Sequence, residues 1–200
     1  MNRTLVGSPC PVCRTPSEGG LTYFDMSILS LVDLIQEAYT AIPPDSHPSS
    51  QSTIDSEMTH SVSVVVFYTT LREALLQRFT MELMFQNNLQ LELRERLYKD
   101  YNSHNERLFK LFPALAGLDW DEALQLVNAS SGKDFSPVSE TMKDIAVIRN
   151  KFVHETNFFG IDRNIATRCI EFLYPTFELF VALHNVLIHS KKFPNPQPAP

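Results

Sequence analysis

The chain has 200 residues, of which 44% are hydrophobic and 20% charged, and its formal net charge is −6. This length and apolar content suit one domain with a packed core and small additions. Glycine is scarce, and Asn-Gly and Asp-Gly turns are absent, which argues against an all-β fold built on tight hairpins. The acidic balance excludes nucleic-acid binding through the overall field, so any contact with RNA requires a local basic cleft.

The three cysteines, Cys10, Cys13 and Cys169, are too few for a disulfide framework and predict a reducing, cytoplasmic location. Cys10-Pro-Val-Cys13 has the spacing of half a zinc site or of a redox pair, but no second pair follows to complete four ligands. We interpret both as free thiols in a flexible N-terminal arm, residues 1–20, and expect no metal and no cofactor; zinc is the weaker alternative. No apolar run of about 18 residues occurs, so no membrane-spanning helix is expected.

Residues 24–41 form the first predicted helix, because their apolar positions recur at helical spacing until Pro43-Pro44 ends the pattern. Residues 43–56, rich in proline and serine, are predicted to be a mobile loop. A long helix is predicted from Thr59 to about Gln86. Its β-branched beginning continues without a break into strongly helical residues, which outweighs the strand propensity.

A third helix is predicted over residues 90–112, where Glu and Lys or Arg pairs four positions apart support an exposed face, and Pro113 should break it. Asp119 is expected to cap a short helix from Trp120 to Asn128. Trp120, the single tryptophan, is interpreted as a core anchor, with a stacking platform for a base as the alternative.

The next helix should begin at Ser136-Pro137, a natural start signal, and end near residues 155–159, before Gly160. The last predicted helix covers residues 162–189, with Asp162 as its cap and Pro175 kinking it near residues 170–171. The proline-rich residues 191–200 are expected to be a disordered tail. Together these elements predict an all-α bundle of about five to six helices, one domain over residues 21–190.

The helix that starts at Ser136 carries the residues with the most chemical promise. Arg149 and His154 are five positions apart, about 140° around a helix and roughly 7.5 Å along it, so long side chains can converge on one phosphate. Arginine matches phosphate oxygens with a planar fork of donors, and histidine carries a proton near neutral pH. Asn150 adds an uncharged amide. These residue types suit metal-independent phosphodiester cleavage, although near a helix end they also suit simple pairing with neighbours.

Arg149-Asn150, three residues and His154, late in a helical chain, resemble the motif of the HEPN (higher eukaryotes and prokaryotes nucleotide-binding) family. These small helical bundles include many ribonucleases of toxin, abortive-infection and CRISPR-associated systems. Residues 108–124 and 142–154 look like the family's approach to the motif, and residues 64–79 like its earlier core helix. The resemblance covers roughly residues 56–190.

The resemblance implies a metal-independent endoribonuclease of a defence or toxin-antitoxin system. His154 would be the general acid or base, Arg149 would stabilise charge on the phosphate, and Asn150 would position the phosphate or the histidine. Glu73 and Lys151 would be supporting residues, with Glu73 orienting Arg149; the alternative for Glu73 is a charge on a solvated face.

The partners implied by the resemblance are RNA, a second copy of the chain and an antitoxin or defence protein, because HEPN ribonucleases pair two motifs across a dimer interface. Thr156 stands where HEPN toxins that pair with a nucleotidyltransferase often carry tyrosine, so the chain departs from that subgroup. The alternative function is a non-catalytic HEPN-like module that binds a nucleotide or a protein.

Overall fold

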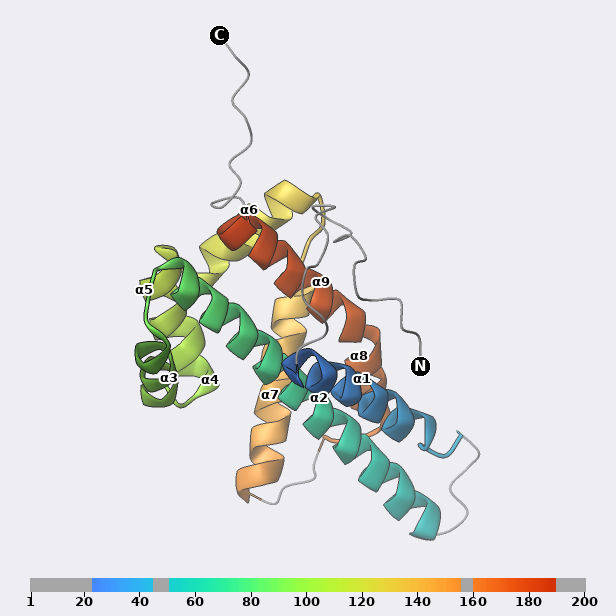
Figure 1. Cartoon of the computed structure of the whole chain (residues 1–200). Helices are drawn as coiled ribbons and strands as arrows, with labels where there is room; N and C mark the ends of the chain where they lie inside the picture. The colour runs from blue at the N-terminus through green and yellow to red at the C-terminus, as the bar shows by residue number, and fades with distance from the viewer. Residues whose placement is uncertain (1–22, 45–50, 156–159, 190–200) are drawn as a thin grey trace.

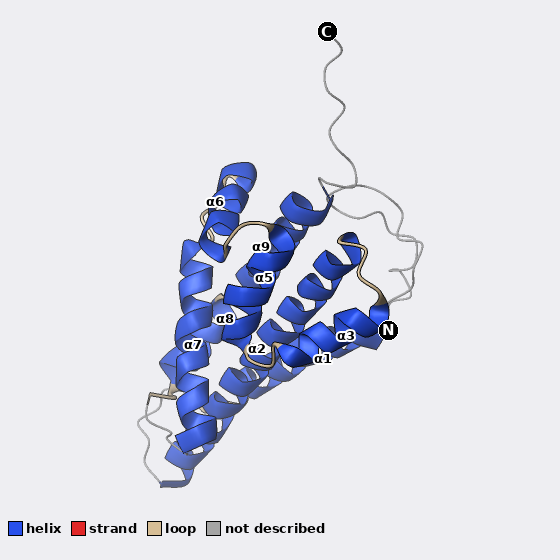
Figure 2. Cartoon of the chain, turned by 90° about the vertical axis from the view of Figure 1, so that its left-hand side faces the viewer, coloured by secondary structure: helices blue, strands red, loops and turns tan. Residues whose placement is uncertain are grey.

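The computed structural model describes residues 23–44, 51–155 and 160–189, and all regular structure in these ranges is helical (Figures 1 and 2). This confirms the predicted all-α class. In chain order the elements are α1 (Tyr23–Thr40), α2 (Gln51–Gln86), α3 (Leu91–Asp100), α4 (His104–Glu106), the π-helix η1 (Arg107–Leu111), α5 (Phe112–Ala116), α6 (Trp120–Ser131), α7 (Ser136–Glu155), α8 (Arg163–Glu171), α9 (Leu173–His184) and the π-helix η2 (Asn185–His189).

Helix α2 is the element around which the others assemble, and it packs against α1, α5, α7, α8 and α9 (Figure 1). Its 36 residues carry a stripe of buried side chains spaced alternately three and four apart, which keeps one face turned to the core. Phe79, in the C-terminal part of this stripe, has its ring centroid 6.1 Å from that of Phe112 and 6.1 Å from that of Phe180. These ring contacts join α2 to α5 and to α9. None of the helices in the described ranges is long and apolar enough to cross a membrane.

The start of α2 corrects the predicted loop. The helix begins at Gln51 rather than Thr59, so residues 51–56 are helical, while residues 45–50 lie outside the described ranges. The loop was predicted from the proline and serine content of residues 43–56, since hydroxyl side chains compete for backbone groups. Here that bonding is compatible with the helix, since the Thr59 hydroxyl donates to the Asp55 carbonyl at 2.7 Å. The N-terminal arm with Cys10 and Cys13, and the predicted tail, lie outside the described residues.

The region predicted as one helix over residues 90–112 is divided differently in the structure. Helix α3 ends at Asp100, and Ser103 caps α4 by accepting a hydrogen bond from the Glu106 amide at 3.2 Å. Pro113 does not end the helical run, because it lies in the first turn of α5, directly after η1. The amide of Phe112 bonds to the carbonyl of Arg107 in the wider π pattern, which relieves the usual conflict between proline and a preceding carbonyl.

Several local predictions are confirmed. Asp119 caps α6 in a capping box with Glu122. Trp120 is a core anchor: it is buried, and its Nε1 donates to the Ser139 hydroxyl at 3.0 Å. Asp162 caps α8, accepting from the Ile165 amide at 3.0 Å. The kink expected from Pro175 appears as the break between α8 and α9 at Phe172.

Candidate functional site

Helix α7 holds the predicted motif in a fixed position on the bundle. Its inner face buries Val138, Met142 and Ile145 in the core. Arg168 of α8 ties the helix down from outside, donating to the Asp144 carboxylate at 2.9 Å and to the Thr141 hydroxyl at 3.0 Å. The motif therefore lies on a rigid element whose last turns extend beyond these anchors (Figure 1).

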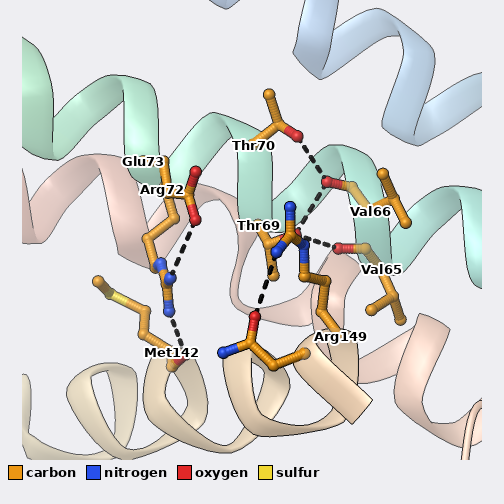
Figure 3. A network of polar contacts seen from close by, with 9 residues as sticks. Val65, Val66, Thr69, Thr70, Arg72, Glu73, Met142 and Arg149 are labelled. Atoms are coloured by element: carbon orange, nitrogen blue, oxygen red, sulfur yellow. Dashed lines mark hydrogen bonds and ion pairs between the residues drawn. The ribbon is translucent and has the colours of Figure 1, made fainter. Parts of the chain in front are cut away.

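The structure brings Arg149 and Asn150 together. Nη1 of Arg149 donates to Oδ1 of Asn150 at 3.1 Å (Figure 3). Arg149 is half-buried, and its Nε is a buried atom with no hydrogen-bond partner among the described residues. Asn150, Lys151 and His154 are all exposed on the outer side of α7. The motif therefore has an inner part at Arg149 and an outer part at His154.

Helix geometry shows how these two parts are related. Successive residues are about 100° apart around the axis, so Asn150 lies between Arg149 and His154: about 100° from the first and about 40° from the second. The Asn150 amide oxygen accepts from Arg149 and so holds the guanidinium against an exposed residue of the same helix. On the helix surface Asn150 thus lies between the half-buried cation and the exposed imidazole.

Glu73 does not make the contact that the sequence suggested. Its carboxylate lies 3.8 Å from Nη2 of Arg72, its neighbour on α2, and its side chain is 41% exposed (Figure 3). Arg149 is oriented instead by the hydrogen bond that it donates to Asn150. The reason is local, because each side chain pairs with its neighbour in the sequence: Glu73 with Arg72 on α2, and Arg149 with Asn150 on α7.

Arg72 is the residue whose environment sequence reasoning missed. It stands beside Glu73 in the sequence, where the pattern suggests a solvated face, yet it is only 2% exposed. Nη1 donates to the main-chain carbonyl of Met142 on α7 at 2.6 Å, while no described residue accepts a hydrogen bond from Nε. Burial lowers the pKa of Arg72; Glu73 and Tyr68 oppose that change, and the charge of Arg149 adds to it. The sequence does carry one indication of this burial, because Arg72 lies on the buried stripe of α2, seven residues before Phe79.

Two further basic residues approach the same region from the segment after α3. His104 begins α4, and its pKa is lowered to about 3, first by burial and then by the charges of Arg72 and Arg107. It is therefore neutral at physiological pH. The guanidinium of Arg107 stacks over the ring of Tyr98, 3.9 Å from its centroid, and Nε donates to the Tyr101 carbonyl at 2.8 Å. We refer to Arg72, His104, Arg107 and Arg149 as the Arg72 cluster.

The described residues form no candidate metal site. No three His, Cys, Asp or Glu side chains gather there in a way that could hold a metal ion. Cys169 is buried in the core, where burial raises its pKa to about 12 and keeps the thiol protonated. Any role of Cys10 and Cys13 falls outside the described ranges.

No family model, curated protein or solved structure matches this chain. The resemblance to the HEPN family therefore stays a prediction carried by the residues of α7, and the chemistry of the site has to be argued from its geometry.

Proposed function

We propose that the protein is a metal-independent endoribonuclease of the HEPN type, with Arg149, Asn150 and His154 as its catalytic residues. The observation that carries the proposal is the hydrogen bond from Arg149 to Asn150, at 3.1 Å, which joins a half-buried cation to an exposed amide on the helix that also presents His154. A defence or toxin-antitoxin setting follows from the resemblance alone.

The reaction needs no group beyond those of RNA and the motif. The 2′-hydroxyl attacks the adjacent phosphorus while an imidazole takes its proton, and the bond to the 5′-oxygen breaks as that oxygen receives a proton. The products are a 2′,3′-cyclic phosphate and a 5′-hydroxyl. Proton transfer of this kind contributes typically about 10²–10⁴-fold. Arg149 stabilises the negative charge that grows on the non-bridging oxygens, and Asn150 holds it there.

One chain offers a single histidine in this motif, whereas the reaction needs a base and an acid. Two copies facing each other along α7 would supply both. The outer side of α7 supports such a contact, because Val147 and Val153 are 55% and 47% exposed beside the polar motif residues. Val147 and His154 are seven positions apart and so lie on the same side of the helix. Lys151, also exposed on α7, adds a positive charge for the RNA backbone.

The test is cleavage of single-stranded RNA in EDTA, followed by detection of cyclic-phosphate ends. We expect cleavage by the wild type, a loss of about 10²-fold or more in His154→Ala, and a comparable loss in Arg149→Gln. His184→Gln is the matched control, because this histidine lies on α9 at the opposite end of the bundle from the motif (Figure 1). Cleavage that requires a metal, or that persists in His154→Ala, rules out the proposal.

Dimer formation has its own test. Val147→Glu places a charge on the proposed contact side of α7 without touching the catalytic groups. We expect it to shift the protein toward monomer in sedimentation and to reduce cleavage in parallel. Reduced self-association with full activity would show that the site works within one copy.

The second candidate is a non-catalytic module that binds a nucleotide or a protein. The exposed position of His154, with no described contact holding it against the motif arginine, favours binding over catalysis. Binding of RNA without cleavage of the unmodified strand would identify this function.

A further inference from the structure

Arg72 is a buried cation with too few partners. A guanidinium has five N–H donors, and a charge removed from water is costly unless it is paired and hydrogen-bonded. Among the described residues its one hydrogen bond goes to a neutral acceptor, the Met142 carbonyl, at 2.6 Å. The Glu73 carboxylate, at 3.8 Å, is beyond hydrogen-bond distance. Nε is left unpaired within the described ranges.

The surroundings of Arg72 increase this imbalance. Arg149 is close enough to lower the pKa of Arg72, and Arg72 and Arg107 together lower that of His104. Nε of Arg149 and Nδ1 of His104 are also buried atoms without a hydrogen-bond partner in the described structure. Groups from α2, α4 and α7 thus each leave a buried nitrogen unsatisfied. The carboxylate that pairs with Arg72 in the described structure is that of Glu73, at 3.8 Å.

We propose that Arg72, His104 and Arg107 form a binding subsite for a phosphate group beside Arg149, and that its occupant is the RNA backbone phosphate next to the one that is cleaved. The identity of the occupant rests on the proposed function; the anion site itself does not.

The side chains suit such an anion. Arginine binds phosphate through charge-assisted, often paired hydrogen bonds, and Arg107 is already fixed by its stacking on Tyr98 and its bond to the Tyr101 carbonyl. A phosphate beside Arg72 would occupy the donors that the protein leaves open. Glu73 would be its internal competitor, because its partly exposed carboxylate is held near Arg72 by charge alone. A local site of this kind also explains how an acidic chain can hold RNA.

The first measurement is calorimetric binding of inorganic phosphate to the full chain. We expect Arg72→Met and Arg107→Gln each to weaken binding by about tenfold or more, the effect of losing one charge-assisted contact. Glu73→Gln should tighten binding, because it removes the competitor. Arg96→Gln is the control: it removes the same charge from a side chain that is 80% exposed and paired only with Asp100, at 3.8 Å. If Arg72→Met does not fold, Arg107→Gln and Glu73→Gln still test the subsite.

The second measurement uses a 2′-O-methyl RNA octamer, which binds but cannot attack its own backbone. Its affinity should fall with Arg107→Gln and not with Arg96→Gln. A wild type that does not bind phosphate, or an Arg107→Gln variant that behaves like Arg96→Gln toward phosphate, overturns the subsite. Phosphate binding with an unchanged octamer affinity in Arg107→Gln overturns the RNA assignment.

Failure of the two proposals can be told apart. Arg107-dependent binding of phosphate and octamer, without cleavage of unmodified RNA in EDTA, would support the subsite and reject the nuclease. Cleavage in EDTA by a protein that does not bind phosphate would support the nuclease and reject the subsite.

Discussion

His104 gives the stability of this protein a defined pH dependence. In the folded chain its pKa is about 3, whereas the ordinary value is 6.5, because burial and the charges of Arg72 and Arg107 disfavour the imidazolium. Between these values the unfolded chain binds the proton and the folded chain does not. The contribution of His104 is therefore fully present above pH 6.5, falls as the pH drops, and is lost near pH 3.

The magnitude follows from the same two values. The whole difference between 6.5 and about 3 corresponds to about 5 kcal/mol in the free energy of unfolding. At pH 5 the unfolded imidazole is mostly protonated, so about 2 kcal/mol of that has been lost relative to pH 7. His104→Leu removes the titrating group, so its free energy of unfolding should fall between pH 7 and pH 5 only by the smaller amount that other groups contribute.

The assay is urea unfolding at several pH values between 5 and 7. This window avoids Glu82, whose pKa is raised by burial but lowered further by its hydrogen bond and charge contact with His184, so that its contribution is lost only at more acid pH. His154→Gln, which removes an exposed imidazole, is the matched control and should keep the wild-type slope. The reasoning is refuted if His104→Leu shows the wild-type slope, or if the His104 ring titrates near pH 6.5 in NMR spectra of the folded protein.

Three further predictions concern stability. Asp119→Ala removes the capping box of α6 and should lower the free energy of unfolding by about 1 kcal/mol in chemical denaturation. Phe112→Ala empties a fully buried ring position and should cost about 3–5 kcal/mol, whereas Phe109→Ala, at a ring 54% exposed, should stay within about 0.5 kcal/mol; equal effects would contradict the described core. Tyr68→Phe removes the buried hydroxyl that pairs with the Thr176 hydroxyl at 2.8 Å and should cost about 1 kcal/mol, visible as a lower thermal midpoint.

Much of the fold could be predicted from the sequence, because helix ends depend on interactions between residues close together in the chain. Asp119 and Asp162 cap α6 and α8 where they were expected, because a cap depends on backbone amides only a few residues away. The break at Phe172 follows from Pro175, whose missing amide is a property of the residue itself. The start of the motif helix was predicted from Ser136-Pro137, because a proline in the first turn fits a helix whatever packs against it.

The tertiary structure decided what the charged residues do. The sequence carries Arg72 beside Glu73 but cannot show that the acceptor for this cation is the Met142 carbonyl, 70 positions away on α7. Pro113 stays within a helical run directly after a π turn, beside Phe112, whose ring packs on that of Trp120 in the core. Spacing and capping act within a few residues, whereas the burial of a charge and its partners depend on which distant elements close around it.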